Sequence, residues 1–363
     1  MPRRNLVPVI LLLATAVPIA LAAQAWESKM ISSGANRPRL AIGRAPWSDA
    51  MIALRHGGAA PADSVIADLI TEGVAVRVGT GVAPTCFIAN LADGRRLDQH
   101  ADAAATAFLP TLRAHIATLR QALARNPIAE GVPESDLALL LYSDVLLDNW
   151  QISGVEAEWL GKERPLRAGG RYYCAALERD PDTREEPFGI WGNASRSTAD
   201  WRIGVYGKDR GDPGLHSVRA GELAHSLGLD TTTLGADELM AAAVTALVSA
   251  HRHTPTDSSF AAVARRLGLW HAGRSTLLVL PAGASERFAE LAAVFRPQLV
   301  AFLRSQDASL TRLQHSLGYE ALTAAEFRIW WYHFFYSALT RELVSAGVIP
   351  TDRASRATYL FPR

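Results

Sequence analysis

The stretch "DLALLLYSDVLLDNWQ", residues Asp136–Gln151, is apolar on nearly every side of a helix, yet it carries two aspartates four positions apart. At about 100° per residue, Asp144 and Asp148 lie on one face among leucines. Because no wide polar face remains, the pattern predicts a buried helix. Like charges at this spacing repel each other, and an unpaired buried carboxylate is costly. We therefore expect the folded chain to supply a compensating partner, an arginine or a histidine.

A second helix that is apolar and aromatic on most sides is predicted over "AEFRIWWYHFFYSALTREL", residues 325–343. Its polar residues fall on one stripe: Glu326, His333, Ser337 and Arg341. Two buried helices that each have one polar stripe pack most simply with those stripes together, or against an arginine-rich neighbour. The partners expected for the aspartates are therefore His333, Arg341, Arg164, Arg167 and Arg171.

This constellation has three interpretations. It is a structural ion-pair network, since such networks also perturb pKa values, or a polar cleft in which one aspartate is a general acid or base. The third interpretation is a metal held by the aspartates and His333. On the second interpretation the candidate catalytic residues are Asp144, Asp148, His333 and Arg341. No metal centre is assigned, and the sequence points to no particular cofactor.

Residues 161–215 differ in composition, because they are dense in glycine, proline, arginine and aromatic residues. Short β-like pieces separated by turn signals predict a β-hairpin and loop insert. Aromatic faces and forked guanidinium donors suit a sugar ring, a carboxylate or a peptide. The candidate ligand-binding residues are Trp191, Asn193, Arg196, Trp201, Arg202 and Tyr206. The alternative is an ordered loop that packs its own aromatic side chains.

The N-terminus, "MPRRNLVPVILLLATAVPIALAAQAW", has a short basic start, an apolar run and small residues at its end. This layout predicts a signal peptide over residues 1–25, cleaved between Ala25 and Trp26. The alternative is an uncleaved N-terminal anchor, because the run is almost long enough to span a bilayer. Both predict export, and only the second predicts attachment to a membrane. Residues 26–46 are polar without an apolar period, which predicts a tether.

Export changes the interpretation of the two cysteines in the chain, Cys86 and Cys174, which lie 88 positions apart. An even number of cysteines in an oxidising compartment favours a disulfide. Two buried thiols that behave as small apolar groups are the alternative. A cysteine nucleophile lacks support, since "RYYCAALERD" shows no residue that would activate Cys174.

The expected fold is mainly α: a single α-rich domain over residues 47–363 with the β/loop insert at about 161–215. The chain of 363 residues has ample material for a core. A strand or hairpin is predicted over 73–91, and two helices between 98 and 127 that separate at Pro110. Further helices are predicted at about 62–72, 219–228, 236–252, 258–268, 284–304 and 323–346.

The charge balance bears on the partners of the protein. There are 37 basic and 36 acidic residues, and removal of Arg3 and Arg4 with the signal peptide leaves 35 against 36. No overall positive field favours nucleic acid. We expect a hydrolase or lyase that acts on a glycan or peptide of the cell envelope, or a non-catalytic protein that binds such a ligand. The sequence alone leaves open whether the protein is an enzyme.

Overall fold

The computed structural model describes residues 26–32, 36–161, 163–178, 190–197, 200–207, 277–353 and 356–363, and a few positions between 230 and 275. The predicted signal peptide and the helices expected at 219–228 and 258–268 lie outside these residues. Within the described part of the chain, no helix is both long enough and apolar enough to cross a membrane.

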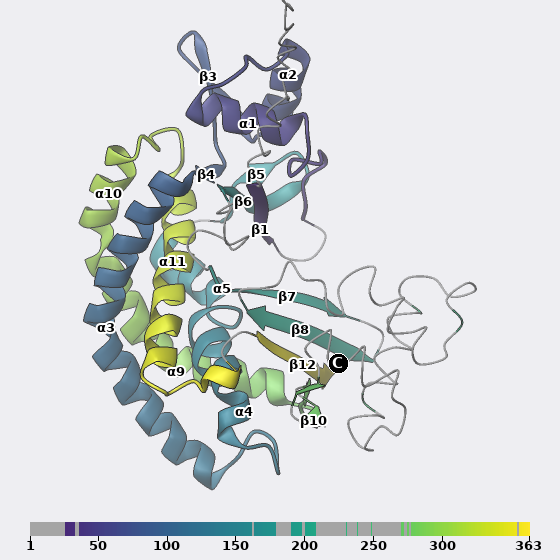
Figure 1. Ribbon diagram of the computed structural model, residues 1–363, viewed down its shortest axis with the longest axis vertical. Helices are drawn as coiled ribbons and strands as arrows, with labels where there is room; N and C mark the ends of the chain where they lie inside the picture. The colour runs from purple at the N-terminus through teal and green to yellow at the C-terminus, as the bar shows by residue number, and fades with distance from the viewer. Residues whose placement is uncertain are drawn as a thin grey trace, which may run out of the picture.

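Long helices form one side of the molecule (Figure 1). They are α3 (Leu91–Arg125), α9 (Ala284–Ser305), α10 (Asp307–Ser316) and α11 (Ala324–Ser345). Helix α11 packs against α3, and it is buried from Phe327 to Thr340 except at Arg328. This burial agrees with its apolar and aromatic sequence. The prediction of a mainly α protein is confirmed.

Helix α3 corrects one expectation, because it runs through Pro110 without a break. A proline inside a helix removes one backbone hydrogen bond and crowds the preceding turn. The buried face of α3, with Ala105, Phe108 and Leu112 around that position, packs into the main core. Tertiary packing of one continuous apolar face outweighs the local cost of the proline.

The opening stretch is helical and buried, but it is not a regular α-helix. Helix α4 (Glu134–Leu139) continues as the π-helix η1 (Leu140–Val145). A turn then leads to α5 (Ile152–Val155) and a second π-helix, η2 (Glu156–Leu160). Every residue from Leu137 to Asp148 is buried. Single π-helical turns occur mostly as bulges inside α-helices, frequently at functional sites.

One sheet pairs a strand that begins at residue 26 with a strand near residue 175. Its strands are β1 (Trp26–Ser32), β4 (Phe87–Ala89), β5 (Leu166–Arg167) and β6 (Gly170–Glu178). Strand β6 is central, with β1 antiparallel to it on one side and β4 parallel on the other. Residues 26–32, expected to begin a tether, are therefore a sheet strand, because β1 pairs with β6 along its whole length.

In a second sheet, the C-terminal strand pairs with a strand from the middle of the sequence. Its order is β11-β12-β8-β7, from β11 (Leu277–Val279), β12 (Arg356–Pro362), β8 (Trp201–Gly207) and β7 (Gly192–Ser197). Strands β7 and β8 pair antiparallel, but β8 also pairs with β12. The structure does not confirm a single central hairpin insert, because the strands of 161–215 belong to two sheets completed by distant segments.

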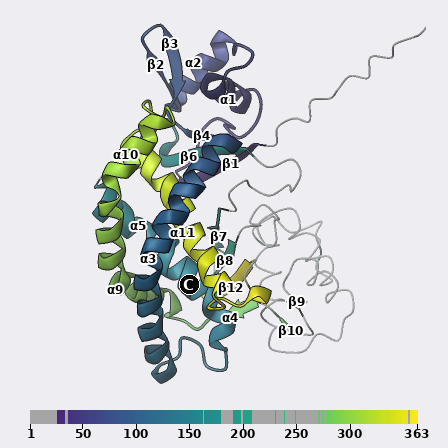
Figure 2. The same ribbon diagram turned by 60° about the vertical axis from the view of Figure 1, so that its left-hand side comes forward.

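A smaller lobe lies at one end of the molecule (Figures 1 and 2). It contains α1 (Trp47–His56), α2 (Asp63–Glu72) and the hairpin of β2 (Ala75–Val78) and β3 (Gly81–Pro84). The lobe has an apolar core of its own with Cys86, Cys174 and Tyr172. The remaining described elements are the short pair β9 (Trp270–His271) and β10 (Arg274–Ser275) and the 3-10 turn η4 (Thr351–Arg353).

Candidate functional site

The Asp144 carboxyl group lies where the π-helix meets the second sheet. Its side chain is fully buried. Oδ2 accepts hydrogen bonds from Asn193 Nδ2 and from the Tyr359 hydroxyl, both at 3.0 Å. Oδ1 accepts a longer bond of 3.4 Å from the backbone N–H of Asn149. Asp144 thus joins η1 to two strands, β7 and β12.

The second sheet places the two donor side chains, Asn193 on β7 and Tyr359 on β12, next to each other. Asn193 Nδ2 also donates to the Tyr359 hydroxyl at 2.6 Å. Tyr359 pairs in register with Gly204 on β8, and a Cβ atom at Gly204 would lie 2.0 Å from the tyrosine ring. The absence of a side chain at Gly204 therefore provides the space in which the phenol ring crosses the sheet to reach Asp144.

A group of hydroxyl side chains adjoins the aspartate. Ser143 Oγ is hydrogen-bonded to both the Tyr206 hydroxyl and Thr340 Oγ1. Thr340 lies on α11 and donates to the carbonyl oxygen of Tyr336 at 2.9 Å. All of these groups are buried. The polar cluster around Asp144 therefore connects η1, the second sheet and the central helix.

Burial raises the pKa of Asp144 well above its usual range, and the neighbouring carboxylate of Asp148 raises it further. The hydrogen bonds from Tyr359, Asn149 and Asn193 favour the charged form and oppose this rise. The pair can act chemically only if a reacting group reaches it.

The residues predicted to join the aspartates contact other groups. His333 is buried on α11, and its Nδ1 bonds to the carbonyl oxygen of Ile329 at 2.8 Å. Arg341 forms ion pairs of 2.7 Å with Asp98 and Asp102 on α3. Asp144 itself is bound by a neutral amide, a phenol and a backbone N–H, and the expectation that at least one of the two aspartates contacts an arginine or a histidine stays a prediction.

The expected arginine partners pair with glutamates instead. Arg164 binds Glu156 through two bonds of 2.8 and 2.9 Å, and Arg171 pairs with Glu163 at 2.8 Å on the surface. Two of the predicted arginines therefore form ion pairs with glutamates among the described residues.

The third arginine, Arg167, is the most buried of the three. Its donors bond to Glu326 Oε2 at 2.9 Å, to the carbonyl oxygens of Tyr172, Gly73 and Thr85, and to Thr85 Oγ1. These five bonds use every N–H of the guanidinium group. Burial raises the pKa of Glu326 to about 7, against the opposing effect of Arg167. The sequence placed Glu326 on a polar stripe expected to meet an arginine-rich neighbour, but it assigned Arg167 to the aspartates and not to Glu326. We regard this pair as structural.

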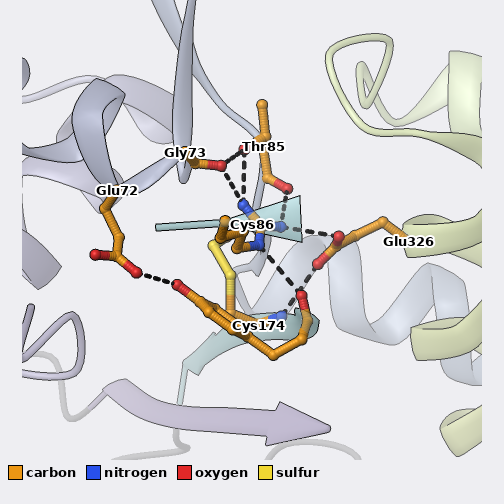
Figure 3. The surroundings of a disulfide bond; sticks show 8 residues. Glu72, Gly73, Thr85, Cys86, Cys174 and Glu326 are labelled. Atoms are coloured by element: carbon orange, nitrogen blue, oxygen red, sulfur yellow. Dashed lines mark hydrogen bonds and ion pairs between the residues drawn. A yellow bond between two sulfur atoms is a disulfide. The ribbon is translucent and has the colours of Figure 1, made fainter. Parts of the chain in front are cut away.

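Next to this pair lies the disulfide between Cys86 and Cys174, with a Cα–Cα distance of 5.2 Å. Figure 3 shows it between Glu72 on one side and Glu326 on the other. Glu326 also accepts a hydrogen bond from the backbone N–H of Cys174 at 3.1 Å. The predicted pairing of the cysteines is confirmed, and the bond ties β6 to the residue that precedes β4.

The predicted ligand-binding residues do not form one open face. Trp191 and Tyr206 are buried, with their ring centroids 5.8 Å apart, and Asn193 is bound to Asp144. Trp201 and Arg202 are half-buried at the other end of β8, where the Arg202 guanidinium lies 5.6 Å from the centroid of the Phe361 ring. The side chain of Arg196 lies outside the described residues.

Three open cavities lined by described residues lie elsewhere. A groove of about 520 Å³ runs between α1 and α2, and a cavity of about 350 Å³ lies between α3 and α4. A smaller one of about 250 Å³ adjoins Leu160 and Arg328. Neither Asp144 nor Asp148 lines any of the three. The groove is lined by Trp26, Pro46, Asp49, Ala50, Ile52, Ala53, Gly57, Ala59, Ala60, Pro61, Ala62 and Val65.

In the part of the chain that the structure covers, no group of three or more His, Cys, Asp or Glu side chains is arranged to hold a metal ion. No protein family, curated protein or solved structure matches this chain. The functional argument therefore rests on the chemistry of the residues themselves.

Proposed function

We propose that this chain is an exported, non-catalytic binding protein of the cell envelope. The observation that carries the proposal is the burial of Asp144, whose two carboxylate oxygens are both bound by groups of the protein. The acid pair then serves as a joint between helix and sheet, and ligand binding falls to an open cavity. The disulfide supports export, because such bonds persist mainly in oxidising compartments.

The ligand site that we propose is the groove between α1 and α2. Its walls are alanine, proline, isoleucine and valine, with the indole of Trp26 at one side. Asp49 is the single charged residue in the lining. A glycan needs many hydrogen-bonding partners to replace water, and this lining offers few. An extended peptide with small apolar side chains and one basic group fits better, since Asp49 would pair with the basic group.

Calorimetric titration of the full-length protein with two hexapeptides tests this ligand. One contains alanine, valine and a single lysine, and the other has glutamate in place of lysine. We expect the lysine peptide to bind several-fold more tightly, and Asp49→Asn to remove that difference. Asp63→Asn, on an exposed residue of α2 outside the lining, is the matched control. Tighter binding of envelope glycan fragments than of either peptide would refute the peptide assignment.

Export is tested separately. A fusion of residues 1–30 to a reporter that is active only outside the cytoplasm should be active in cells. The basic, apolar and small-residue segments of this stretch are the reason for this expectation. A fusion that stays in the cytoplasm would contradict export.

A second candidate function, a hydrolase or lyase of envelope glycan or peptide, is favoured by one observation. The π-helical turn at Leu140–Val145 carries a carboxyl group whose pKa is raised by burial, and both features occur often at active sites. Asp144 would then be the general acid. Turnover of an envelope substrate that Asp144→Asn abolishes, with an unchanged melting temperature, would favour this function over the binding protein.

A further inference from the structure

The cavity between the C-terminal end of α3 and α4 has aliphatic walls and one polar end. Leu123 comes from α3, Ile128 and Val132 come from the connecting loop, and Leu137 and Leu141 come from α4 and η1. No aromatic side chain contributes to the lining. Figures 1 and 2 show the end of α3 and α4 at the same end of the molecule, opposite the small lobe. The cavity suits a flexible hydrocarbon chain.

The polar end is formed by Arg120 and Glu134. Arg120 Nε donates to Glu134 Oε1 at 2.6 Å, and the Tyr142 hydroxyl donates to the same oxygen at 2.5 Å. Glu134 thus holds the Nε side of the guanidinium group. Arg120 Nη1 and Nη2 donate to no residue that the structure describes. The two side chains of this ion pair are about two-fifths exposed, so this end opens to solvent.

The loop that closes the cavity is held in place by α9. Arg287 donates from Nη1 to the carbonyl oxygen of Pro127 at 2.8 Å, and from Nη2 to that of Asn126. Ile128 and Ala129, which follow, are buried. The cavity is therefore formed before any ligand arrives, which reduces the ordering cost of binding.

We propose that this cavity binds a free, medium-chain fatty acid. The chain would occupy the aliphatic volume, and the carboxylate would accept two parallel hydrogen bonds from Arg120 Nη1 and Nη2. A methylene group takes roughly the volume of one water molecule, about 30 Å³, so the cavity of about 350 Å³ has room for roughly ten carbons. This site and ligand are separate from the groove between α1 and α2, and neither assignment depends on the other.

Equilibrium dialysis of the full-length protein against radiolabelled decanoate tests the proposal, with decan-1-ol as the uncharged analogue. We expect saturable binding of one decanoate per chain. Arg120→Gln should weaken decanoate binding about tenfold, from the loss of a charged hydrogen-bonding pair, and leave decan-1-ol binding unchanged. Arg113→Gln, on an exposed arginine of α3 outside the lining, is the matched control and should bind decanoate normally.

A second pair of variants tests the position of the chain. Ala124 is exposed at the rim of the cavity, so Ala124→Trp should reduce decanoate binding by tenfold or more without disturbing the core. Ala122→Trp, at an exposed position outside the lining, should not. Absence of saturable binding to the folded protein, or equal binding by both tryptophan variants, would overturn the proposal. It would equally be overturned if the protein bound phospholipid vesicles in an Ala124-dependent way but no free decanoate.

Discussion

Gly204 on β8 stands opposite Tyr359 on β12, and a methyl group on Gly204 would lie 2.0 Å from the tyrosine ring. The phenol that crosses this position holds the carboxyl group of Asp144 on the π-helix. The missing side chain at Gly204 thereby allows the Tyr359 hydroxyl to donate a hydrogen bond to the buried carboxyl group of Asp144.

The first prediction concerns this glycine. Gly204→Ala should displace the Tyr359 ring and lower the free energy of unfolding by about 1–3 kcal/mol, the usual cost of overpacking a core. Gly81→Ala is the control, because the nearest atom to its Cβ would be the Val78 oxygen at an ordinary 3.7 Å. Urea unfolding measures both. Equal stability of the two variants would contradict the tight approach at Gly204.

The second prediction concerns the bond between Asp144 and Tyr359. Asp144→Ala and Tyr359→Phe should each destabilise the protein, since each leaves a buried polar group without its partner. In a double-mutant cycle the pair should show a coupling energy of about 0.5–3 kcal/mol. Tyr173→Phe is the matched control, because the buried hydroxyl of Tyr173 bonds to none of the described residues. A coupling energy near zero would show that the acid pair is not anchored through the sheet.

The third prediction concerns the disulfide. Reduction, or replacement of both Cys86 and Cys174 by serine, should lower the free energy of unfolding by up to about 4–5 kcal/mol, as expected for a loop of this length. Guanidinium unfolding with and without reductant measures the effect, and the double serine variant should not respond to reductant. Two alkylatable thiols in the denatured, unreduced protein would contradict the bond.

The fourth prediction concerns pH. Burial raises the pKa of Glu326 from 4.5 to about 7 in the folded protein, so the folded state holds a proton that the unfolded state has released. The stability from this proton is complete below about pH 4.5 and is lost as the pH rises towards 7. The slope for one proton is at most about 1.4 kcal/mol per pH unit.

Glu326→Gln should therefore flatten the fall in unfolding free energy across that pH window. Glu163→Gln, which removes an exposed carboxylate paired with Arg171, should leave the slope unchanged. Urea unfolding at several pH values from 4 to 8 compares the variants with the parent. An unchanged slope in Glu326→Gln would mean that another group dominates the pH dependence.

Several features of the fold could be predicted because they depend on neighbouring residues. The apolar period around Asp144 indicated a buried helix, and the structure has one, although part of it is π-helical. The aromatic run over 325–343 indicated a buried helix, and α11 is central. Pro110 misled the prediction, because a local breaker gives no information about the packing on the opposite face of α3.

The partners within the candidate site could not be predicted in the same way. Asp144 meets Asn193, 49 positions away, and Tyr359, 215 positions away. Arg167 meets Glu326 at a separation of 159 positions. Each contact depends on how the strands pair within a sheet and on where that sheet meets a helix. The short strands that form the two sheets carry weak sequence signals. The polar stripe on α11 likewise gave no sign that Arg341 forms ion pairs with Asp98 and Asp102 on α3.

The sequence by itself determined that two carboxylates would be buried and that two cysteines were free to pair. Burial follows from the hydrophobicity and period of adjacent residues, and cysteine pairing depends on the number of thiols and their compartment. Only the tertiary structure decided which groups would bind the buried carboxyl group of Asp144. A hydrogen bond requires donor and acceptor within about 3 Å, and the Gly204 gap that lets Tyr359 reach Asp144 exists only once β8 and β12 have paired.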